Sequence, residues 1–496
     1  RNSNRGGGQA DRVEGGRVDL RIVSTDPIQQ LGRDFCKPAE QLAIDRAELK
    51  DYSRTLIGMS VLPRAPIALL MVVVAGLIIA AGVVLHRRGR LEYAAATAAA
   101  LCILVGLAMV IVGLAKRRSV PLTMAGVQFV QVAPHQQHGV VLGALTVYSP
   151  AEDKGPLKAT KGGVVWPDTQ HQQGEMLRMV WTDFDQWTWD NLKLPSGANL
   201  ATSFRHVTAL AEPVGVTVSV DEDGVVGQVR SGPLGLLEDL VLAGPSGNLA
   251  PRRRSDEDET FVATPDDALA PGQFIRAAVL SDVQVRRRRL FSRLLEQTPG
   301  YPAEPTMLAW SSRLQLGFTL PQEFVHRDAT LVAVPVTLQP PVAGRKVTIS
   351  GELLSFQLAR GEGLPATATA FDPNTLEWIP MNSGQTVALR FILPPAFRDI
   401  DVTAATLDLR IRAPSFRVEV QTWDRTAREA QTVYSVNNPL DRVIAPLPGS
   451  PHLHVDDEGG VLVIIKVTSP PGRNSFDDAN VWQIRGLSLE VQGVAP

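Results

Sequence analysis

Two long apolar runs dominate the hydrophobic pattern of the first quarter of the chain. Residues 67–85 contain no polar side chain, and residues 93–115 contain only Thr97 and Cys102 as mildly polar interior positions. At about 1.5 Å per residue, a helix of either length crosses a hydrocarbon core of roughly 30 Å. The short connection between the runs leaves room only for a turn, so we expect a transmembrane hairpin over residues 65–118.

Small residues inside the two runs mark where these helices are expected to pack. Gly76 and Ala80 are four positions apart in the first run, and Gly106 and Gly113 lie in the alanine-rich second run. Small side chains let helix backbones approach closely in lipid, which favours packing of the runs against each other or against another membrane protein. Neither run contains an ionisable residue, so a proton or ion path through this hairpin alone is not expected.

The connection between the runs carries basic residues that bear on orientation. Its sequence, HRRGRLE, contains Arg87, Arg88 and Arg90, whereas five lysines and arginines flank the outer ends of the two runs. Both ends of the chain leave the hairpin on one side. A bare count of basic residues would therefore place the long domains in the cytoplasm, although the margin is small.

Beyond residue 118 the pattern changes to short alternating strands separated by turns rich in proline and glycine. Residues 214–220 and 225–231 flank the sequence Asp-Glu-Asp-Gly and predict a hairpin. Further strands are expected at 330–338, 386–393, 406–412, 416–423, 461–467 and 482–491. Leu407, Leu409 and Ile411 point to one side of their strand, as expected for a sheet with one buried face. This pattern is typical of antiparallel β-sandwiches.

One amphipathic helix interrupts the strands. Ser281 and Gln284 form a capping box that predicts where the helix begins. Its apolar face is expected to contain Val283, Leu290, Phe291, Leu294 and Leu295. Its remaining surface carries Arg286, Arg287, Arg288, Arg289 and Arg293. These arginines indicate either a solvated face on a domain-packing helix or a contact with lipid headgroups or an acidic partner.

The predicted fold class is a membrane-anchored all-β protein, in which a two-helix transmembrane hairpin precedes two antiparallel β-sandwich domains with one linking helix. Residues 1–64 are expected to be an extracytoplasmic segment, partly disordered, with a strand at 17–24 and a helix at 45–59, and to be the tail of a larger upstream domain. The expected divisions after it are the hairpin at 65–118, a first sandwich at 119–245, a linking region with the helix at 246–340, and a second, jelly-roll-like sandwich at 341–496.

Charge, cysteine content and motifs narrow the functional classes. The formal net charge of −2 gives no electrostatic case for a nucleic-acid partner. Cys36 lies in the amino-terminal segment and Cys102 within an apolar run, so a disulfide between them is not expected. The sequence contains no phosphate-binding glycine motif and no nucleophile-turn motif, so neither catalytic residues nor a cofactor site are expected.

A tryptophan-rich stretch, WTDFDQWTWDNLKLP, is the main candidate for a binding surface. If residues 181–189 form one strand, alternation places five side chains on one face: Trp181, Asp183, Asp185, Trp187 and Trp189. Such a face suits a protein interface, where tryptophan is an enriched anchor, or a sugar platform of rings beside carboxylates. The alternative is that the rings form the sandwich core, although two acids on the same face argue against a wholly dry core.

An acidic stretch, HLHVDDEGG, is the candidate for a metal site. Asp456 and Asp457, together with Asp477, could bind calcium through carboxylate oxygens. His452 and His454 would share one face of a strand, as ligands of another metal might need. The simpler interpretation is an acidic turn that precedes the next strand, and no bound metal is expected.

The order of these segments resembles a group of poorly characterised bacterial integral membrane proteins. The sequence reads LPRAPIALL, a span, HRRGRLE, a second span, KRRSVPLTMAGVQFVQV and GALTVYSPAED, with TMLAWSSRLQLGF and GQTVALRFILPP further on. The resemblance implies an amidotransferase-like α/β domain upstream, a cytoplasmic arginine-rich turn and extracytoplasmic β domains. It also implies similarity to accessory proteins of ABC-type exporters of the gliding-motility kind. No catalytic residues come with it.

The function expected from these features is that of a non-catalytic scaffold or accessory subunit in the bacterial cytoplasmic membrane, with most of the chain extracytoplasmic. Its partners would be membrane lipids and other integral membrane proteins of a larger complex. A first alternative is a carbohydrate-binding protein for envelope glycans, which would depend on Trp187 and Trp189. A second alternative is an enzyme that processes envelope polymers, which would require convergent acids in a cleft.

Overall fold

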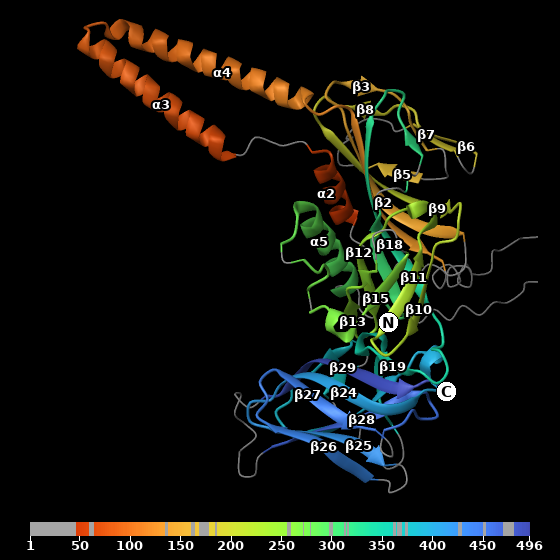
Figure 1. The fold of residues 1–496 in the computed structure, drawn as a ribbon. Helices are drawn as coiled ribbons and strands as arrows, with labels where there is room; N and C mark the ends of the chain where they lie inside the picture. Colours follow the sequence, from red (N-terminus) through yellow and green to blue (C-terminus); the bar gives the residue numbers. More distant parts are fainter. Residues whose placement is uncertain are drawn as a thin grey trace, which may run out of the picture.

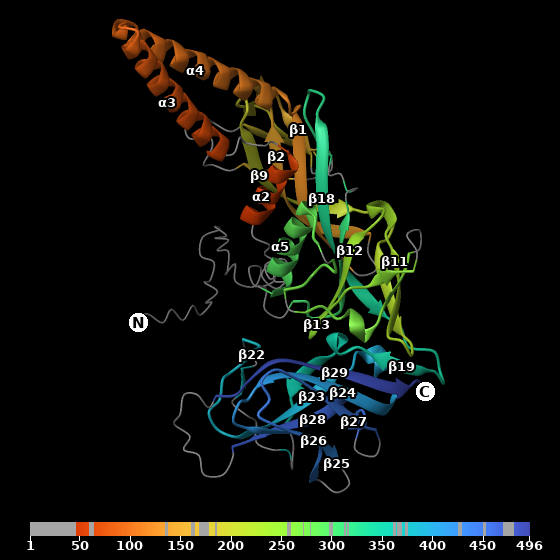
Figure 2. The same cartoon turned by 60° about the vertical axis from the view of Figure 1, so that its left-hand side comes forward.

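The structure is a computed structural model, and it describes most of the chain after residue 45. The described residues are 46–58, 64–133, 137–159, 164–167, 178–183, 186–254, 259–270, 272–277, 279–296, 301–311, 314, 317–360, 364, 370–372, 375–424, 429–449, 453–469 and 481–496. The strand expected at 17–24 and Cys36 lie outside them. The helical hairpin and the last sheets occupy opposite ends of the molecule, with a large β-sheet body between them (Figures 1 and 2).

Three helices open the described chain. They are α2 (Arg46–Leu56), α3 (Arg64–Arg87) and α4 (Ala94–Arg118), and the short 3₁₀ helix η1 (Leu91–Tyr93) precedes α4. The helix expected at 45–59 is confirmed as α2. α3 and α4 are long and apolar enough to cross a membrane by length and composition, and they project away from the rest of the molecule (Figure 1). Their apolar side chains are largely exposed, for example Val72 and Ile103.

The body next to the hairpin is built on a sheet of 12 strands in the described part of the chain. Its main path runs β14-β15-β11-β10-β18-β1-β2-β9-β5, and β16, β12 and β13 branch from β18. The strands are β1 (Thr123–Val132), β2 (His138–Tyr148), β5 (Val164–Pro167), β9 (Asn199–Ala209), β10 (Gly215–Val220), β11 (Val225–Arg230), β12 (Glu238–Gly244), β13 (Gly247–Leu249), β14 (Arg252–Arg253), β15 (Thr260–Ala263), β16 (Thr306–Ser311) and β18 (Val325–Leu338). The hairpin predicted at 214–231 is confirmed as β10 and β11, which are antiparallel.

The long strand β18 organises this sheet. It pairs with β1 in parallel from Val325 to Ala333, and then with β10 in parallel from Val336 to Leu338. Its other edge pairs with β16 in antiparallel fashion. The expectation of a purely antiparallel first sandwich is therefore wrong at the centre of the sheet. Parallel pairs need long crossover connections, and here about two hundred residues separate β1 from β18.

Both faces of the central strands are covered. On one face, α2 and α5 (Asp282–Glu296) pack against β1, β12, β16 and β18 through a cluster that includes Tyr52, Phe129, Phe291 and Trp310. On the other face lies a small sheet in the order β17-β4-β7-β6. Its strands are β4 (Leu157–Ala159), β6 (Met179–Asp183), β7 (Gln186–Trp189) and β17 (Phe318–Thr319). The short pair β3 (Asp153–Lys154) and β8 (Lys193–Leu194) lies beside it in sequence. Strands buried on both faces are typical of parallel pairing.

The predicted linking region at 246–340 is not a separate connector. Its strands β14, β15, β16 and β18 belong to the same sheet as β1 and β2, and its helix α5 covers that sheet. The domain boundary expected at residue 245 therefore falls inside one structural body. The reason is that β18 supplies the edge on which both β1 and β10 pair.

The second body is a sandwich of two antiparallel sheets. One has the order β19-β29-β24-β27 and the other β20-β23-β28-β25-β26. The strands are β19 (Lys346–Ile349), β20 (Ser355–Leu358), β23 (Gln385–Ile392), β24 (Asp401–Arg412), β25 (Arg417–Asp424), β26 (Glu429–Asn437), β27 (Arg442–Pro448), β28 (Gly460–Thr468) and β29 (Gln483–Val494), with the small pair β21 (Phe371–Asp372) and β22 (Glu377–Trp378). Leu407, Leu409 and Ile411 are fully buried between the sheets, as their alternation predicts.

Two turns of the first body join it to the sandwich. The backbone N–H of Thr348 donates to the carbonyl of Asp221 at 2.7 Å, which adds the β10–β11 turn to the end of β19. Ser246 in the β12–β13 turn donates through its hydroxyl to the carbonyl of Leu354 at 2.5 Å. A Cβ at Gly244 would overlap the carbonyl of Glu352, so the chains touch backbone to backbone here. These contacts couple the two bodies directly.

Candidate functional site

A pocket of about 340 Å³ opens where β18 changes partners. β1 pairs with β18 as far as Gln131 opposite Ala333, and β10 begins its pairing at Val216 opposite Val336. Val334 and Pro335 therefore have no partner strand on this edge within the described registers. The gap between the end of β1 and the start of β10 forms the pocket. Its volume is at the lower end of the range for small-ligand pockets, roughly 300–1,000 Å³.

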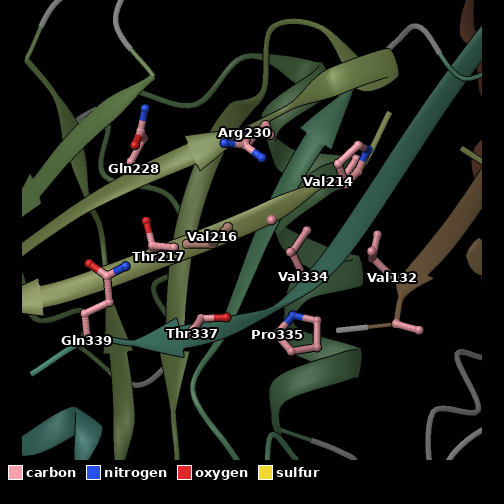
Figure 3. A pocket seen from close by; sticks show the side chains of 13 residues that line it. Val132, Val214, Val216, Thr217, Gln228, Arg230, Val334, Pro335, Thr337 and Gln339 are labelled. Atoms are coloured by element: carbon pink, nitrogen blue, oxygen red, sulfur yellow. The ribbon is translucent and has the colours of Figure 1, made fainter. Parts of the chain in front are cut away.

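Valines of three strands border the pocket. Val132 from β1, Val216 from β10 and Val334 from β18 are among its lining residues, with Val214 and Pro335 beside them (Figure 3). Val132, Val214, Val216 and Val334 are buried, because their strands also contribute to the main core of this body. The walls are therefore held by the sheet itself and not by a loop.

A row of polar side chains borders the aliphatic walls. Thr217 lies opposite Gln228 on β11 and opposite Thr337 on β18 in the sheet register. Gln339, just past the end of β18, extends the row (Figure 3). Arg230, two residues after Gln228 and so on the same face of β11, is the one ionisable side chain in the lining.

Gly215 leaves space beside Arg230. The two residues are partners in the β10–β11 register, and Gly215 supplies no side chain to fill the position opposite the guanidinium. A Cβ built on Gly215 would meet no atom within 4 Å. A larger residue at this position would therefore enter the pocket instead of colliding with the sheet.

The strands of this pocket were predicted from the sequence, but the pocket was not. Thr217, Gln228 and Arg230 are polar positions in the hairpin predicted at 214–231, and strand alternation places Gln228 and Arg230 on one face of β11. What the sequence analysis missed was the pairing of β10 with β18, which brings in Thr337 and Gln339. A solitary arginine among threonines and glutamines was the available signal.

The tryptophan stretch folds differently from the single strand predicted for 181–189. The chain turns back after β6, so that Trp181 and Trp187 are partners in an antiparallel hairpin of β6 and β7. Trp187 and Trp189 are buried in the main core, at 1% and 0% exposure. The prediction of an exposed platform that contains these two rings is therefore wrong. Both rings lie in the core, as the alternative interpretation expected. The side chains of Trp181 and Asp183, and all of Asp185, lie outside the described residues.

The acidic stretch forms a turn held by an arginine. Asp456 accepts the backbone N–H groups of Glu458 and Gly460, and its other oxygen lies 2.6 Å from Nε of Arg390. The carboxylate of Asp456 is thus already neutralised by a cation. Asp457 and His454 lie beside it in the chain, whereas Asp477 and His452 lie outside the described residues. Among the residues that the structure describes, no three potential ligands gather to hold a metal ion.

The arginines of α5 form the predicted solvated face only in part. Arg287 is largely buried and pairs with Asp239 at 2.5 Å and Glu238 at 2.7 Å, with its guanidinium over the ring of Trp310. Arg286 lies over the ring of Tyr52. Arg293 pairs with Glu48 of α2. The acidic partners are therefore in this chain, while Arg288 and Arg289 remain exposed.

The apolar face of α5 is as predicted except at its first turn. Leu290, Phe291 and Leu294 are buried, and Leu295 packs partly buried against the same cluster. Val283 is 40% exposed, contrary to prediction.

The residues expected to pack within the hairpin are all exposed. Gly76, Ala80, Gly106 and Gly113 lie on open faces of α3 and α4, and a Cβ built on any of the three glycines meets nothing within 4 Å. They do not form the contact between the two helices. Arg87, Arg88 and Arg90 are exposed at the turn.

A buried acid lies on the opposite face of β18 from α2 and α5. Asp328 accepts the backbone N–H of Gly126 at 3.1 Å, and His326 Nδ1 lies 3.9 Å from its other oxygen. Burial raises the pKa of Asp328 to about 6, against the smaller lowering effects of His326 and the Gly126 N–H. Gln128 donates to Thr330 and to the carbonyl of Leu314 nearby. This cluster is nearly closed, with a cavity of only about 20 Å³.

Comparisons with known proteins add little to this geometry. A scan against protein families found no match, and neither did a search of curated proteins. Among solved structures, a family 29 carbohydrate-binding module is 11% identical and covers 30% of this chain and 89% of its own, with a TM-score of 0.16. The coconut allergen cocosin is 9% identical and covers 72% of this chain and 77% of its own, with a TM-score of 0.11. Scores this low carry no argument about fold or ligand.

Proposed function

We propose that this chain is a membrane-anchored, non-catalytic subunit that binds a partner in a larger membrane assembly. In this proposal α3 and α4 cross the bacterial cytoplasmic membrane, the turn with Arg87, Arg88 and Arg90 is cytoplasmic, and the two β bodies are extracytoplasmic. The supporting features are the docking of the segments that flank the hairpin on the first β body and the open small-residue faces of its helices.

The observation that carries the proposal is that the segments before and after the hairpin, α2 and the end of α4, both dock on the same sheet. On the α3 side, α2 docks through Leu49 and Tyr52 in the cluster around Trp310. Arg327 of β18 donates to the carbonyl of Leu56 at the end of α2 at 3.0 Å. The hydroxyls of Ser53 and Thr146 share a buried hydrogen bond of 2.5 Å between α2 and β2.

On the α4 side the helix continues almost directly into the sheet. β1 begins five residues after α4 ends. The buried hydroxyl of Tyr148 donates to the carbonyl of Arg117 in the last turn of α4 at 2.8 Å. A simple anchor needs only a flexible tether, whereas here both segments that flank the hairpin dock on the sheet. Such docking keeps the β bodies close to the helices, which is useful to a subunit that must meet other parts of an assembly.

The helix faces support a partner inside the membrane. Helix association in lipid depends on close backbone approach at small residues. Gly76 and Ala80 lie one turn apart on α3, with no atom near a Cβ built on Gly76. A helix of another membrane protein is the occupant that these exposed positions favour in lipid.

The test is the native mass of the full chain extracted in mild detergent, with mass spectrometry of whatever co-migrates. We expect the protein in the membrane fraction and a stoichiometric integral membrane partner. Gly76→Leu should reduce recovery of that partner. Gly82→Leu is the matched control, because Gly82 has equally open surroundings but points about 120° away around the helix. A lone monomer, or equal loss of partner in both variants, would contradict the proposal.

Orientation has its own test. Cys36 and Cys102 are replaced by serine, and a single cysteine is introduced as Arg88→Cys in the turn. In intact cells from which the outer barrier has been removed, a membrane-impermeant maleimide should label this variant only after the membrane is opened. Labelling without opening would reverse the proposed orientation.

A further inference from the structure

We propose that the joint between the two β bodies is a proton-sensitive contact, which tightens when the carboxyl group of Glu352 is protonated and loosens when it ionises. The proposal goes beyond the proposed function, since it concerns contacts outside the hairpin and does not depend on membrane insertion. Three features carry it: the position of Glu352 between the bodies, the acids around it, and the lack of a compensating charge on the first body.

Glu352 lies in the short 3₁₀ helix η5 (Gly351–Leu353), which packs between the two bodies. η5 contacts β12 and β13 of the first body and β29 of the sandwich, and β13 and β29 lie on either side of the joint (Figures 1 and 2). Leu353 belongs to the hydrophobic core of the first body, whereas Leu354 belongs to that of the sandwich. Glu352 is therefore at the point where the two cores meet.

The side chain of Glu352 lies against the β12–β13 turn. A Cβ built on Gly247 would lie 2.8 Å from Cγ of Glu352, and the backbone N–H of Ser246 donates to the carbonyl of Glu352 at 3.3 Å. Glu352 is partly buried, and the hydroxyl of Ser350 donates to its carboxylate. Ionisation of Glu352 therefore places a negative charge within the contact between the bodies.

The groups of the sandwich that face Glu352 make this charge unfavourable. Burial raises the pKa of Glu352, and hydrogen bonds from Ser350 and from its own backbone N–H oppose the rise. The carboxylates of Asp408 on β24 and Glu490 on β29 raise the pKa further. Arg442 is already paired with Asp408 at 2.8 Å. Among the described residues, no basic side chain forms an ion pair with Glu352.

The first body supplies no compensating charge to Glu352. Residues 244–248, which form the β12–β13 turn and its flanks, read GPSGN and contain no ionisable side chain. At the other contact between the bodies, the β10–β11 turn supplies Asp221 and Glu222, and Glu222 pairs with Lys346 of the sandwich at 3.9 Å. Ionised Glu352 thus has acids near it on the sandwich and only neutral groups facing it from the β12–β13 turn.

The direction of the pH effect follows from the raised pKa. A carboxyl group that binds its proton more tightly in the closed joint than in the open one favours closure at low pH. The contribution of Glu352 to closure is complete below its ordinary pKa of 4.5 and is lost as the pH rises through the raised value. The joint is therefore tightest in acid and weakens as the pH rises.

Hydrogen exchange of the full chain in detergent, followed by mass spectrometry, tests the proposal. The reporting amides are that of Ser246, which donates across the joint, and those of Leu353 and Leu354, which close η5. The ratio of the exchange rate in the wild type to that in Glu352→Gln removes the intrinsic pH dependence of exchange. This ratio should rise at least about threefold between about pH 4 and pH 8, because only the wild type acquires the charge.

Two further variants are matched to Glu352→Gln. Glu222→Gln removes an acid at the other contact, where the side chain is 73% exposed, and its ratio should not change with pH. Glu490→Gln should reduce the pH dependence without removing it, because burial affects the pKa of Glu352 more than Glu490 does. Exchange within β28 should be equal in the wild type and Glu352→Gln at each pH, which distinguishes opening of the joint from unfolding of the sandwich.

Either of two results overturns the proposal. One is a ratio for Glu352→Gln that is the same at every pH or falls as the pH rises, which would leave Glu352 with a structural role alone. The other is an equal pH dependence for Glu352→Gln and Glu222→Gln, which would assign the effect to the general charge of the joint and not to Glu352.

Discussion

The two β bodies of this protein bury their strands in different ways. In the second body, β24 and β29 alternate buried and exposed positions along most of their length. In the first body, β1 is buried at nearly every position, because α2 and α5 cover one face and the small β4–β7 sheet covers the other. The first body therefore has three layers around its central strands, whereas the second is a two-layer sandwich.

This difference determines where polar groups are buried. In the sandwich the charged residues of β24 point to solvent, and Asp408 meets Arg442 at its surface. In the first body even polar residues of the central strands are enclosed, as with Gln128, Asp328 and the Arg287 pair. Buried polar groups must find partners, so these enclosed positions should be more sensitive to polar substitutions than the Asp408–Arg442 pair. The buried Arg390–Asp456 pair of the sandwich should resemble them in this respect.

The largest expected contrast is between two arginine–aspartate pairs. The side chains of Arg287 and Asp239 are only 13% and 11% exposed, whereas those of Arg442 and Asp408 are 58% and 23% exposed. Arg287→Gln should lower the free energy of unfolding by about 3 kcal/mol, because it leaves a buried carboxylate unpaired. Arg442→Gln should cost less than about 1 kcal/mol, since water screens its pair.

Urea unfolding of both variants, followed by circular dichroism, measures this contrast. Equal losses in the two variants would mean that burial of the strands does not control the energetics of these pairs. A loss confined to Arg442→Gln would reverse the comparison between the bodies.

A second contrast depends on pH. Asp328 has a pKa of about 6 in the folded protein against an ordinary value of 3.8, so the folded state binds the proton more tightly than the unfolded state. Its contribution to stability is complete below pH 3.8 and is lost as the pH rises through about 6. Between pH 4 and pH 7 the free energy of unfolding of Asp328→Asn should therefore increase relative to that of the wild type, by at most about 3 kcal/mol.

The measurement is the difference in unfolding free energy between Asp328→Asn and the wild type at each pH. Taking the difference removes the contributions of all other carboxyl groups. A flat difference for Asp328→Asn would show that this carboxyl group titrates as if it were exposed.

The smallest contrast concerns two strand glycines. A Cβ at Gly126 of β1 would lie 2.6 Å from Oδ1 of Asp328, whereas a Cβ at Gly486 of β29 would lie 3.5 Å from its nearest atom, in Arg410. Gly126→Ala should destabilise by about 1–3 kcal/mol through crowding. Gly486→Ala should change stability by less than about 1 kcal/mol, with a gain possible from the stiffer unfolded chain. Thermal melting of the two variants compares them, and equal shifts would contradict the steric account.

Prediction from the sequence succeeded where each strand or helix carried its own signal. Five strands of the sandwich, β23, β24, β25, β28 and β29, and the β10–β11 hairpin were predicted near their observed positions, because alternation reports one buried face. The strands β19, β20, β26 and β27 were not predicted. The apolar helices α3 and α4 and the buried residues of α5 were predicted for similar reasons. The prediction of a single strand from Trp181 to Trp189 was wrong, because nothing in the local sequence pattern indicates the turn between β6 and β7.

The sequence by itself determined which segments are strands, which are helices and which helices are apolar throughout, since these properties depend on neighbours within a few residues. Only the tertiary structure decided that β18 joins β1 to β10, that α5 directs its arginines toward acids of the same chain, and that a gap beside Val334 and Pro335 forms a pocket. Those features depend on pairings between residues 48 or more positions apart. Their energies come from contacts that no local pattern contains.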